Sequence, residues 1–341
     1  MEKTRLGRTN LLVSRTAFGA LPIQRVSFDE AKKLLVKAYD NGINFFDTAR
    51  AYSDSEEKLG YALSDVRKDI ILATKTFAKD KQSLFSNLET SLSNLKTDYI
   101  DIYQLHNPEE LPDPHDPEGV YKGLMEAKEK GLIRFVGITC HRLDNALEAV
   151  CSGLYDTVQF PLSYISSEKE LSIIDECIKH DIGLIAMKAL SGGLITNAAC
   201  AFAFLRMYKN VTPIWGIQRE SELDEFLALE KNPPQMSEEM WDYIKKDRNQ
   251  LSGNFCRGCG YCMPCPAQIN IPIAARMSLL LRRAPYQQFI TEKGKEGMEL
   301  INKCVDCGQC KTKCPYKLDT PRILKDMLKD YLEFYRSHTQ K

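Results

Sequence analysis

Cysteine is the residue whose number and spacing most clearly predict chemistry. Of the 12 cysteines, eight fall between Cys256 and Cys314. They form two sets, CRGCGYCMPCP from Cys256 and CVDCGQCKTKCP from Cys304. Three thiolates two residues apart can surround three corners of one cubane cluster, and the fourth, followed by proline, can ligate the other cluster. The spacing therefore predicts two [4Fe–4S] clusters, which carry single electrons.

The predicted ligands cross between the two sets. One cluster takes Cys256, Cys259, Cys262 and Cys314. The other takes Cys304, Cys307, Cys310 and Cys265. Two alternatives are less favoured by the pattern, since zinc sites usually show two separated C-x2-C pairs and disulfides are uncommon in cytoplasmic proteins.

A second group of reactive side chains lies in the first third of the chain. Asp47 ends the apolar run INFFD, Lys75 ends DIILATK, and His106 ends YIDIYQLH. Tyr52 follows in the segment after Asp47. These types suit carbonyl reduction, because a hydride that reaches a carbonyl carbon leaves an alkoxide that needs a proton.

Each of these side chains has an expected role. An ammonium at Lys75 is expected to lower the pKa of the Tyr52 hydroxyl, which is near 10 when free. Asp47 is expected to hold Lys75 charged and oriented. His106 is expected to hydrogen-bond the substrate oxygen.

Short apolar runs alternate with amphipathic segments over the first 230 residues, as strands and helices do. The predicted strands are residues 15–20, 43–47, 69–75, 99–106, 133–139, 156–160, 183–188 and 212–217. Eight such repeats predict an α/β fold of the (β/α)8 TIM-barrel type, whose active sites lie at the carboxyl ends of the strands. A doubly wound sheet is the alternative, but the chain contains no G-x-G-x-x-G fingerprint.

The composition changes near Asn232-Pro233-Pro234. We expect the barrel to span residues 1–235, a linking helix 236–250, and a small α-helical, ferredoxin-like domain 251–341, because the spacer between the cysteine sets has a helical pattern. Residues 4–14 predict a hairpin that turns at 8–10 and closes the barrel floor.

Charge and hydropathy argue against a nucleic-acid-binding, membrane or secreted protein. Lys plus Arg and Asp plus Glu both number 46, which gives no support for nucleic-acid or anionic-membrane binding. No apolar run reaches the roughly 18 residues of a membrane span, and the first 20 residues lack the pattern of a secretion signal. We therefore expect a cytoplasmic protein without membrane or nucleic-acid partners.

The segments around the four polar residues resemble the aldo-keto reductases. The resemblance rests on NFFDTARAYSDSEEKLG, ILATK and IYQLH, and it extends from about Arg5 to Leu229. The whole chain resembles the bacterial and archaeal subgroup with a C-terminal dicluster ferredoxin-like domain. This resemblance implies an NAD(P)H-dependent reductase with a tetrad of Asp47, Tyr52, Lys75 and His106, in which Tyr52 is the general acid.

The resemblance also implies contacts to NADP or NAD. Thr139 and Gln159 correspond to residues that bind the nicotinamide amide, and Met187 stands where an aromatic residue usually covers the ring. The remaining candidates are Gly216 and Gln218 for the pyrophosphate, with Lys188 and Arg219 for a 2′-phosphate. Cys140, Glu222 and Phe226 depart from the family pattern.

The two halves together predict an oxidoreductase that interconverts a small carbonyl compound and its alcohol. Its clusters would relay electrons to a ferredoxin-like partner, with a nicotinamide or flavin converting between one- and two-electron steps. Two alternatives stay open: clusters that are purely structural, and an iron–sulfur redox sensor or electron-transfer subunit whose barrel is not a reductase. The substrate is not identified.

Overall fold

The computed structural model describes residues 1–251 and 255–339 of the chain. The chain divides into two compact units. The barrel unit comprises Met1–Ala189 and Ala198–Trp241, and the cysteine unit comprises Leu190–Asn197 and Asp242–Lys341. The predicted domain limits at 235 and 250 stay predictions.

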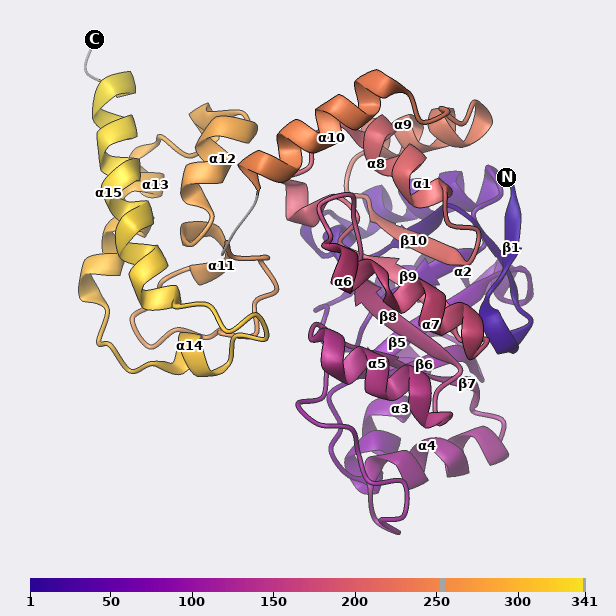
Figure 1. Cartoon of the computed structure of the whole chain (residues 1–341). Helices are drawn as coiled ribbons and strands as arrows, with labels where there is room; N and C mark the ends of the chain where they lie inside the picture. Colours follow the sequence, from indigo (N-terminus) through magenta and orange to yellow (C-terminus); the bar gives the residue numbers. More distant parts are fainter. Residues whose placement is uncertain (252–254, 340–341) are drawn as a thin grey trace. The chain divides into compact units, whose positions relative to one another are not determined.

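The barrel unit is built on eight parallel strands that close on themselves in the order β10-β3-β4-β5-β6-β7-β8-β9. Helices surround these strands (Figure 1). The strands are β3 (Ala17–Gly19), β4 (Phe45–Asp47), β5 (Ile71–Thr76), β6 (Ile100–His106), β7 (Ile133–Thr139), β8 (Thr157–Pro161), β9 (Gly183–Met187) and β10 (Val211–Gly216). Each differs by no more than two residues at either end from the predicted run. The predicted (β/α)8 barrel is therefore confirmed.

The strand register brings the predicted polar residues to one end of the barrel. Lys75 pairs with Gln104 between β5 and β6, and His106 pairs with Thr139 between β6 and β7. Thr139 in turn pairs with Gln159 of β8. Because the strands are parallel, their carboxyl ends and the loops that follow them share this face.

Helices follow the strands around the barrel. They are α1 (Phe28–Asp40), α2 (Ser55–Leu63), α3 (Lys81–Leu95), α4 (Val120–Glu129), α5 (Leu143–Ser152), α6 (Glu168–Leu171), α7 (Ile173–Lys179), α8 (Ala198–Arg206) and α9 (Glu220–Lys231). Short 3-10 helices are η1 (Gly7–Thr9), η2 (Pro22–Arg25) and η3 (Ser64–Asp69). Side chains define several helix starts: Ser27 and Glu30 form a capping box at α1, and Asp80 caps α3.

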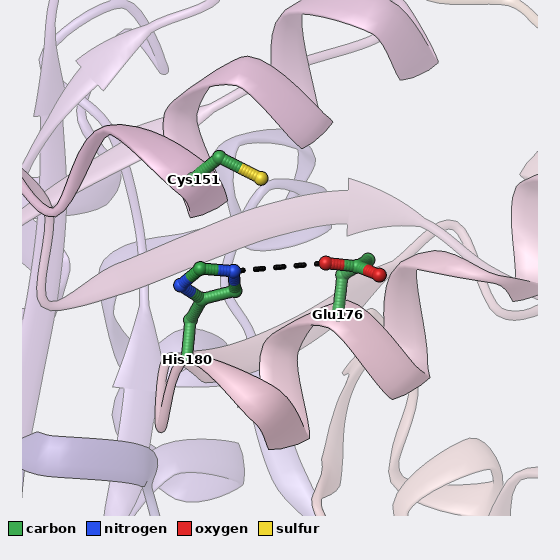
Figure 2. Close-up of side chains that lie close together, drawn as sticks. All are labelled: Cys151, Glu176 and His180. Atoms are coloured by element: carbon green, nitrogen blue, oxygen red, sulfur yellow. Dashed lines mark ion pairs between the residues drawn. The ribbon is translucent and has the colours of Figure 1, made fainter.

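The opposite end of the barrel is closed by an antiparallel hairpin, as predicted. Its strands are β1 (Lys3–Arg5) and β2 (Leu12–Ser14). Leu6, Leu11 and Val13 pack with inward-facing strand residues. The carboxyl ends of α5 and α7 lie side by side (Figure 2). These helix ends precede β8 and β9, so they belong to the end of the barrel that holds the hairpin.

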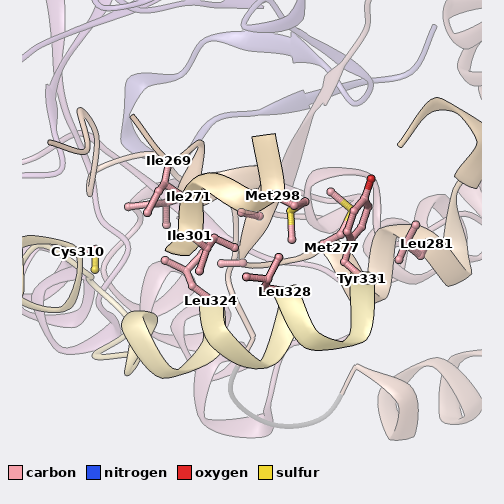
Figure 3. Packing of buried hydrophobic residues seen from close by; sticks show 12 residues of the cluster. Ile269, Ile271, Met277, Leu281, Met298, Ile301, Cys310, Leu324, Leu328 and Tyr331 are labelled. Atoms are coloured by element: carbon pink, nitrogen blue, oxygen red, sulfur yellow. The ribbon is translucent and has the colours of Figure 1, made fainter. Parts of the chain in front are cut away.

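The cysteine unit is helical. Its elements are η4 (Ser191–Gly193), α11 (Ile271–Ala274), α12 (Met277–Arg283), η5 (Tyr286–Gln288), α13 (Glu292–Glu299), η6 (Leu300–Lys303), α14 (Gln309–Thr312) and α15 (Thr320–Thr339); α10 (Glu238–Gln250) crosses from the barrel unit. Leu324, Leu328 and Tyr331 recur along one side of α15 and pack on Met277 and Met298 (Figure 3). The predicted small α-helical domain is confirmed. None of the described helices is long and apolar enough to cross a bilayer.

Candidate functional site

A buried ion pair lies at the carboxyl ends of β4 and β5. Lys75 Nζ donates to Asp47 Oδ2 at 2.6 Å and to the Thr48 carbonyl oxygen at 2.5 Å. Gln104 Nε2 donates to Asp47 Oδ1 at 3.2 Å. The side chains of Lys75 and Asp47 are only 1% and 3% exposed. Their charges are thus paired away from water, and both side chains are held in one orientation.

Tyr52 and His106 lie beside this pair. Lys75 Nζ is 5.4 Å from the centre of the Tyr52 ring. The rings of Tyr52 and His106 meet edge to face, with centres 5.9 Å apart and planes at 84°. The loop that carries Tyr52 is closed by hydrogen bonds from Tyr52 N to Ala49 O and from Ser55 N to Tyr52 O. The structure therefore brings all four predicted residues together.

Burial controls the proton affinities of this group. It raises the pKa of Tyr52, with a further rise from the Asp47 carboxylate. The expected lowering of the Tyr52 pKa is therefore wrong, because burial and the Asp47 carboxylate both favour the neutral hydroxyl. Burial lowers the pKa of Lys75, which Asp47 opposes, and burial together with Lys75 lowers the pKa of His106 to about 3. His106 is therefore a neutral imidazole at physiological pH.

Two residues of this site were not predicted. Gln104 orients the Asp47 carboxylate, and Phe77 stacks on His106 with ring centres 4.3 Å apart. Their positions carried a signal, since Gln104 precedes His106 by two residues and Phe77 follows Lys75 by two. Residues two apart on a strand point to the same side. A polar residue inside the apolar run YIDIYQLH was the clue to Gln104.

The predicted nicotinamide residues form a buried polar row across β7 and β8. Thr139 and Gln159 are each 1% exposed. Gln159 also hydrogen-bonds the Asp47 carboxylate. Over the described part of the chain, Thr139 Oγ1 and Gln159 Oε1 have no hydrogen-bond partner. A carboxamide offers both a donor and acceptors, so it fits this row, and Met187 lies nearby at the end of β9 as an apolar cover.

The predicted phosphate segment is arranged differently. Glu222 Oε2 accepts hydrogen bonds from Gln218 N at 2.8 Å and from Arg219 N at 3.0 Å. Glu222 Oε1 pairs with the Arg219 guanidinium, at 2.6 Å from Nη2. A carboxylate of the chain thus occupies the donors at the start of α9 that a phosphate would use. Gly216 is exposed, and Lys188 is half-buried and contributes to lowering the pKa of His141.

The cysteines of the two sets are interleaved in space. Burial and the nearby thiols of Cys259 and Cys314 raise the pKa of Cys256. Burial raises the pKa of Cys310, and so do the nearby thiols of Cys304, Cys307 and Cys265. A pocket is lined by five cysteines together with other residues, the cysteines being Cys262, Cys265, Cys304, Cys307 and Cys310. Cys314 and Cys265, which the spacing predicted to cross over, are among these neighbours, and Cys262 also neighbours Cys310.

The spacing of the sulfur atoms bears on which metal group they fit. A single zinc ion with Zn–S bonds of about 2.3 Å requires sulfurs about 3.8 Å apart. Within residues 1–251 and 255–339, the only trio of potential ligand atoms that lie within 4.8 Å of one another is outside the two sets. Among the described residues, no three cysteines of the two sets form such a trio.

Arg276 is a further residue of this site that was not predicted. It is 7% exposed, and its Nη1 donates to Gly192 O at 2.9 Å. A Cβ at Gly258, which has a φ of 65°, would lie 2.8 Å from Arg276 Cζ. The guanidinium therefore packs on the first cysteine loop, where it favours the thiolate of Cys256.

Comparisons with known proteins agree with this description. Residues 16–200 match the Aldo/keto reductase family, and residues 255–319 match the 4Fe-4S dicluster domain. An uncharacterized oxidoreductase of Bacillus subtilis, YqkF, is 32% identical over 58% of this chain and 67% of its own length. L-galactose dehydrogenase of Arabidopsis thaliana is 31% identical over 58% of this chain and 68% of its own length. The holo form of a Bacillus halodurans aldo-keto reductase has a TM-score of 0.62 and 22% identity, over 72% of this chain and 96% of that one, and so supports the fold.

Proposed function

The chain belongs to the aldo/keto reductase family and carries a 4Fe-4S dicluster domain, and we propose that it interconverts a small carbonyl compound and its alcohol with a nicotinamide cofactor. The observation that carries this proposal is the meeting of Asp47, Tyr52, Lys75 and His106 at one end of the barrel. An acid, an imidazole and a buried charge pair at the same strand ends match the needs of carbonyl reduction.

The side chains have separate roles in this proposal. When bound, the nicotinamide supplies or accepts the hydride. Tyr52 gives its proton to the substrate oxygen, and its raised pKa keeps that proton in place at neutral pH. The transfer is downhill because an alkoxide is a stronger base than a phenolate. Neutral His106 donates a hydrogen bond to the same oxygen, and the Lys75–Asp47 pair supplies a fixed field beside Tyr52.

Replacement of Tyr52 by phenylalanine tests this proposal. We expect Y52F to lower kcat for aldehydes and ketones by about 10²–10⁴-fold, the usual contribution of a general acid, while the melting temperature stays unchanged. Y61F, which removes a hydroxyl from an exposed tyrosine of α2, is the matched control. Equal activity of Y52F and the natural protein would instead favour the alternative, a redox sensor whose barrel is not a reductase.

The proposed nucleotide binds by its amide end at Thr139 and Gln159, with Met187 over the ring. Buried, unpaired oxygens on Thr139 and Gln159 support this end of the site. At the other end Glu222 holds the backbone donors of Gln218 and Arg219 as well as the Arg219 side chain. A 2′-phosphate at Arg219 would compete with this carboxylate, so we propose that Glu222 weakens the binding of NADPH.

We further propose that the two sets of cysteines hold two [4Fe–4S] clusters, divided as Cys256, Cys259, Cys262, Cys314 and Cys304, Cys307, Cys310, Cys265. When bound, the clusters exchange single electrons with a ferredoxin-like partner. The interleaved neighbourhoods of Cys256 and Cys310 support this division. The buried Arg276 charge favours a reduced cluster at the first loop, since reduction adds a negative charge.

Replacement of Cys304 by serine distinguishes electron relay from a structural role. We expect C304S to keep its turnover with a nicotinamide donor but to lose at least 90% of turnover with reduced ferredoxin as donor, while the barrel keeps its melting temperature. C200A, which alters a barrel cysteine outside both sets, is the control. If both activities survive when iron counting shows that the cluster is lost, the relay is wrong and the clusters are structural.

A further inference from the structure

A compact trio of metal-binding side chains lies away from the proposed active site and from the cysteine sets. Cys151 Sγ, a carboxylate oxygen of Glu176 and a ring nitrogen of His180 all lie within 4.8 Å of one another (Figure 2). Glu176 Oε2 and His180 Nε2 are 3.6 Å apart. No step of the proposed function uses any of the three residues.

The backbone around this trio is well defined. Glu176 and His180 are four residues apart, on α7 and at its carboxyl end, so they face the same side of one turn. His180 N donates to Glu176 O at 3.0 Å, and His180 O accepts from Arg8 Nη2 at 2.6 Å. Cys151 is the penultimate residue of α5, whose end is set by Gly153 at a φ of 74°. The two helix ends that carry the ligands therefore form a fixed frame.

We propose that Cys151, Glu176 and His180 form a site for one divalent ion of the Zn²⁺ class, with a water molecule as the fourth ligand. A thiolate, an imidazole and a carboxylate are the three protein ligands that Zn²⁺ prefers, whereas Mg²⁺ and Ca²⁺ require oxygen ligands. Tetrahedral zinc places such ligand atoms about 3.4–3.6 Å apart. Rotation of the exposed Cys151 side chain can bring its sulfur from within 4.8 Å of the other two ligand atoms to this shorter distance. The thiol proton of Cys151 is released to solvent on binding.

The surrounding charges set the expected strength of the site. Lys179 Nζ is 3.4 Å from Glu176 Oε2, but its side chain is 68% exposed and can turn away. The Arg8 guanidinium donates to the carbonyl oxygens of His180 and Gly153. Because this positive charge stays close to the proposed metal site, we expect a dissociation constant in the micromolar range.

The position of the site in the fold determines what a bound ion would do to the barrel. α5 ends just before β8 begins, and α7 ends just before β9 begins. The trio therefore lies at the amino-terminal ends of the strands, opposite the carboxyl ends that carry Lys75 and His106. A bound ion would cross-link α5 and α7, and it would stabilise the folded barrel without entering the carbonyl reaction.

Zinc binding to the cluster-loaded protein tests this inference. With the protein kept anaerobic, we expect equilibrium dialysis at buffered micromolar Zn²⁺ to find one zinc ion per chain with no loss of iron, together with a rise in melting temperature. C151S and H180N are expected to weaken binding at least tenfold and to abolish the rise. H115N, which alters an exposed histidine elsewhere, is expected to bind zinc as the natural protein does.

Two results would overturn the site. The first is unchanged zinc affinity in C151S or H180N, provided that without zinc each variant has the same melting temperature as the natural protein. The second is release of iron in proportion to the zinc bound, which would place the ion on the cluster cysteines. Carbonyl reduction by Y52F is a separate measurement, so failure of the zinc site and failure of the proposed reductase are distinguishable.

Discussion

The end of the barrel that carries Lys75 and the cysteine loops organise their functional side chains in opposite ways. In the barrel, Asp47, Lys75 and His106 come from three strands, are buried, and hydrogen-bond or stack on one another or on neighbouring side chains. In the cysteine unit, most of the cysteines of the two sets are half-buried or exposed. A closed barrel holds its polar side chains by contacts within the protein, whereas we expect the cysteine loops to depend on the proposed clusters.

Breaking the buried pair in the barrel should have the largest effect. We expect K75M to lower the free energy of unfolding by about 3–5 kcal/mol, because Asp47 is left as a buried charge without its partner. Denaturant unfolding measures this change. K79M, at an exposed lysine four residues later, should change stability by less than about 0.5 kcal/mol. Equal stability of the two variants would contradict a preformed charge pair.

Iron removal should affect the two units unequally. After extraction of the proposed clusters, we expect the cysteine unit to lose its cooperative unfolding transition, since the proposed ligands of each cluster come from both cysteine sets. The barrel transition should stay within about 2 °C, corresponding to less than about 1 kcal/mol for a unit of this size. Calorimetry before and after extraction measures both transitions. If the barrel lost its transition together with the cysteine unit, the expected difference between the two units would be wrong.

Replacement of Glu222 should sharpen the description of the nucleotide site. We expect E222Q to bind NADPH about 3–10-fold more tightly, because it removes a negative charge that holds the donors at the start of α9. NADH affinity should change less. Fluorescence titration measures both, with E225Q on the exposed side of α9 as control. A similar gain for both nucleotides in E222Q would rule out discrimination at the 2′-phosphate.

The pH dependence of carbonyl reduction should show the smallest effect. Burial lowers the pKa of His106 from its ordinary 6.5 to about 3. The folded protein therefore binds this proton only near pH 3, while the unfolded chain binds it near 6.5. We expect kcat to show no fall through pH 6.5, and the contribution of His106 to stability to decline as pH drops from 6.5 toward 3. A kcat limb near 6.5 that is absent in H106N would contradict the burial of this imidazole.

Much of the fold was readable because each strand is a short apolar run followed by a helix-start or turn signal. Asp47, Lys75 and His106 could be predicted to share one end of the barrel since parallel strands align their carboxyl ends. Gln104 and Phe77 were missed, although their two-residue spacing from His106 and Lys75 would have placed them on the same side. The capping of α9 by Glu222 was not predicted, because a glutamate three residues into a helix also fits an exposed face.

The sequence by itself determined the barrel, the helical cysteine domain and the identity of the reactive side chains, because periodicity and local spacing encode these features. Only the tertiary structure decided how protons and charges are shared among them. Lys75 donates to Asp47 and Thr48, while burial and Asp47 raise the pKa of Tyr52. The ends of α5 and α7 bring Cys151 to Glu176 and His180. Burial and distance set these energies, and both depend on residues that are far apart in the chain.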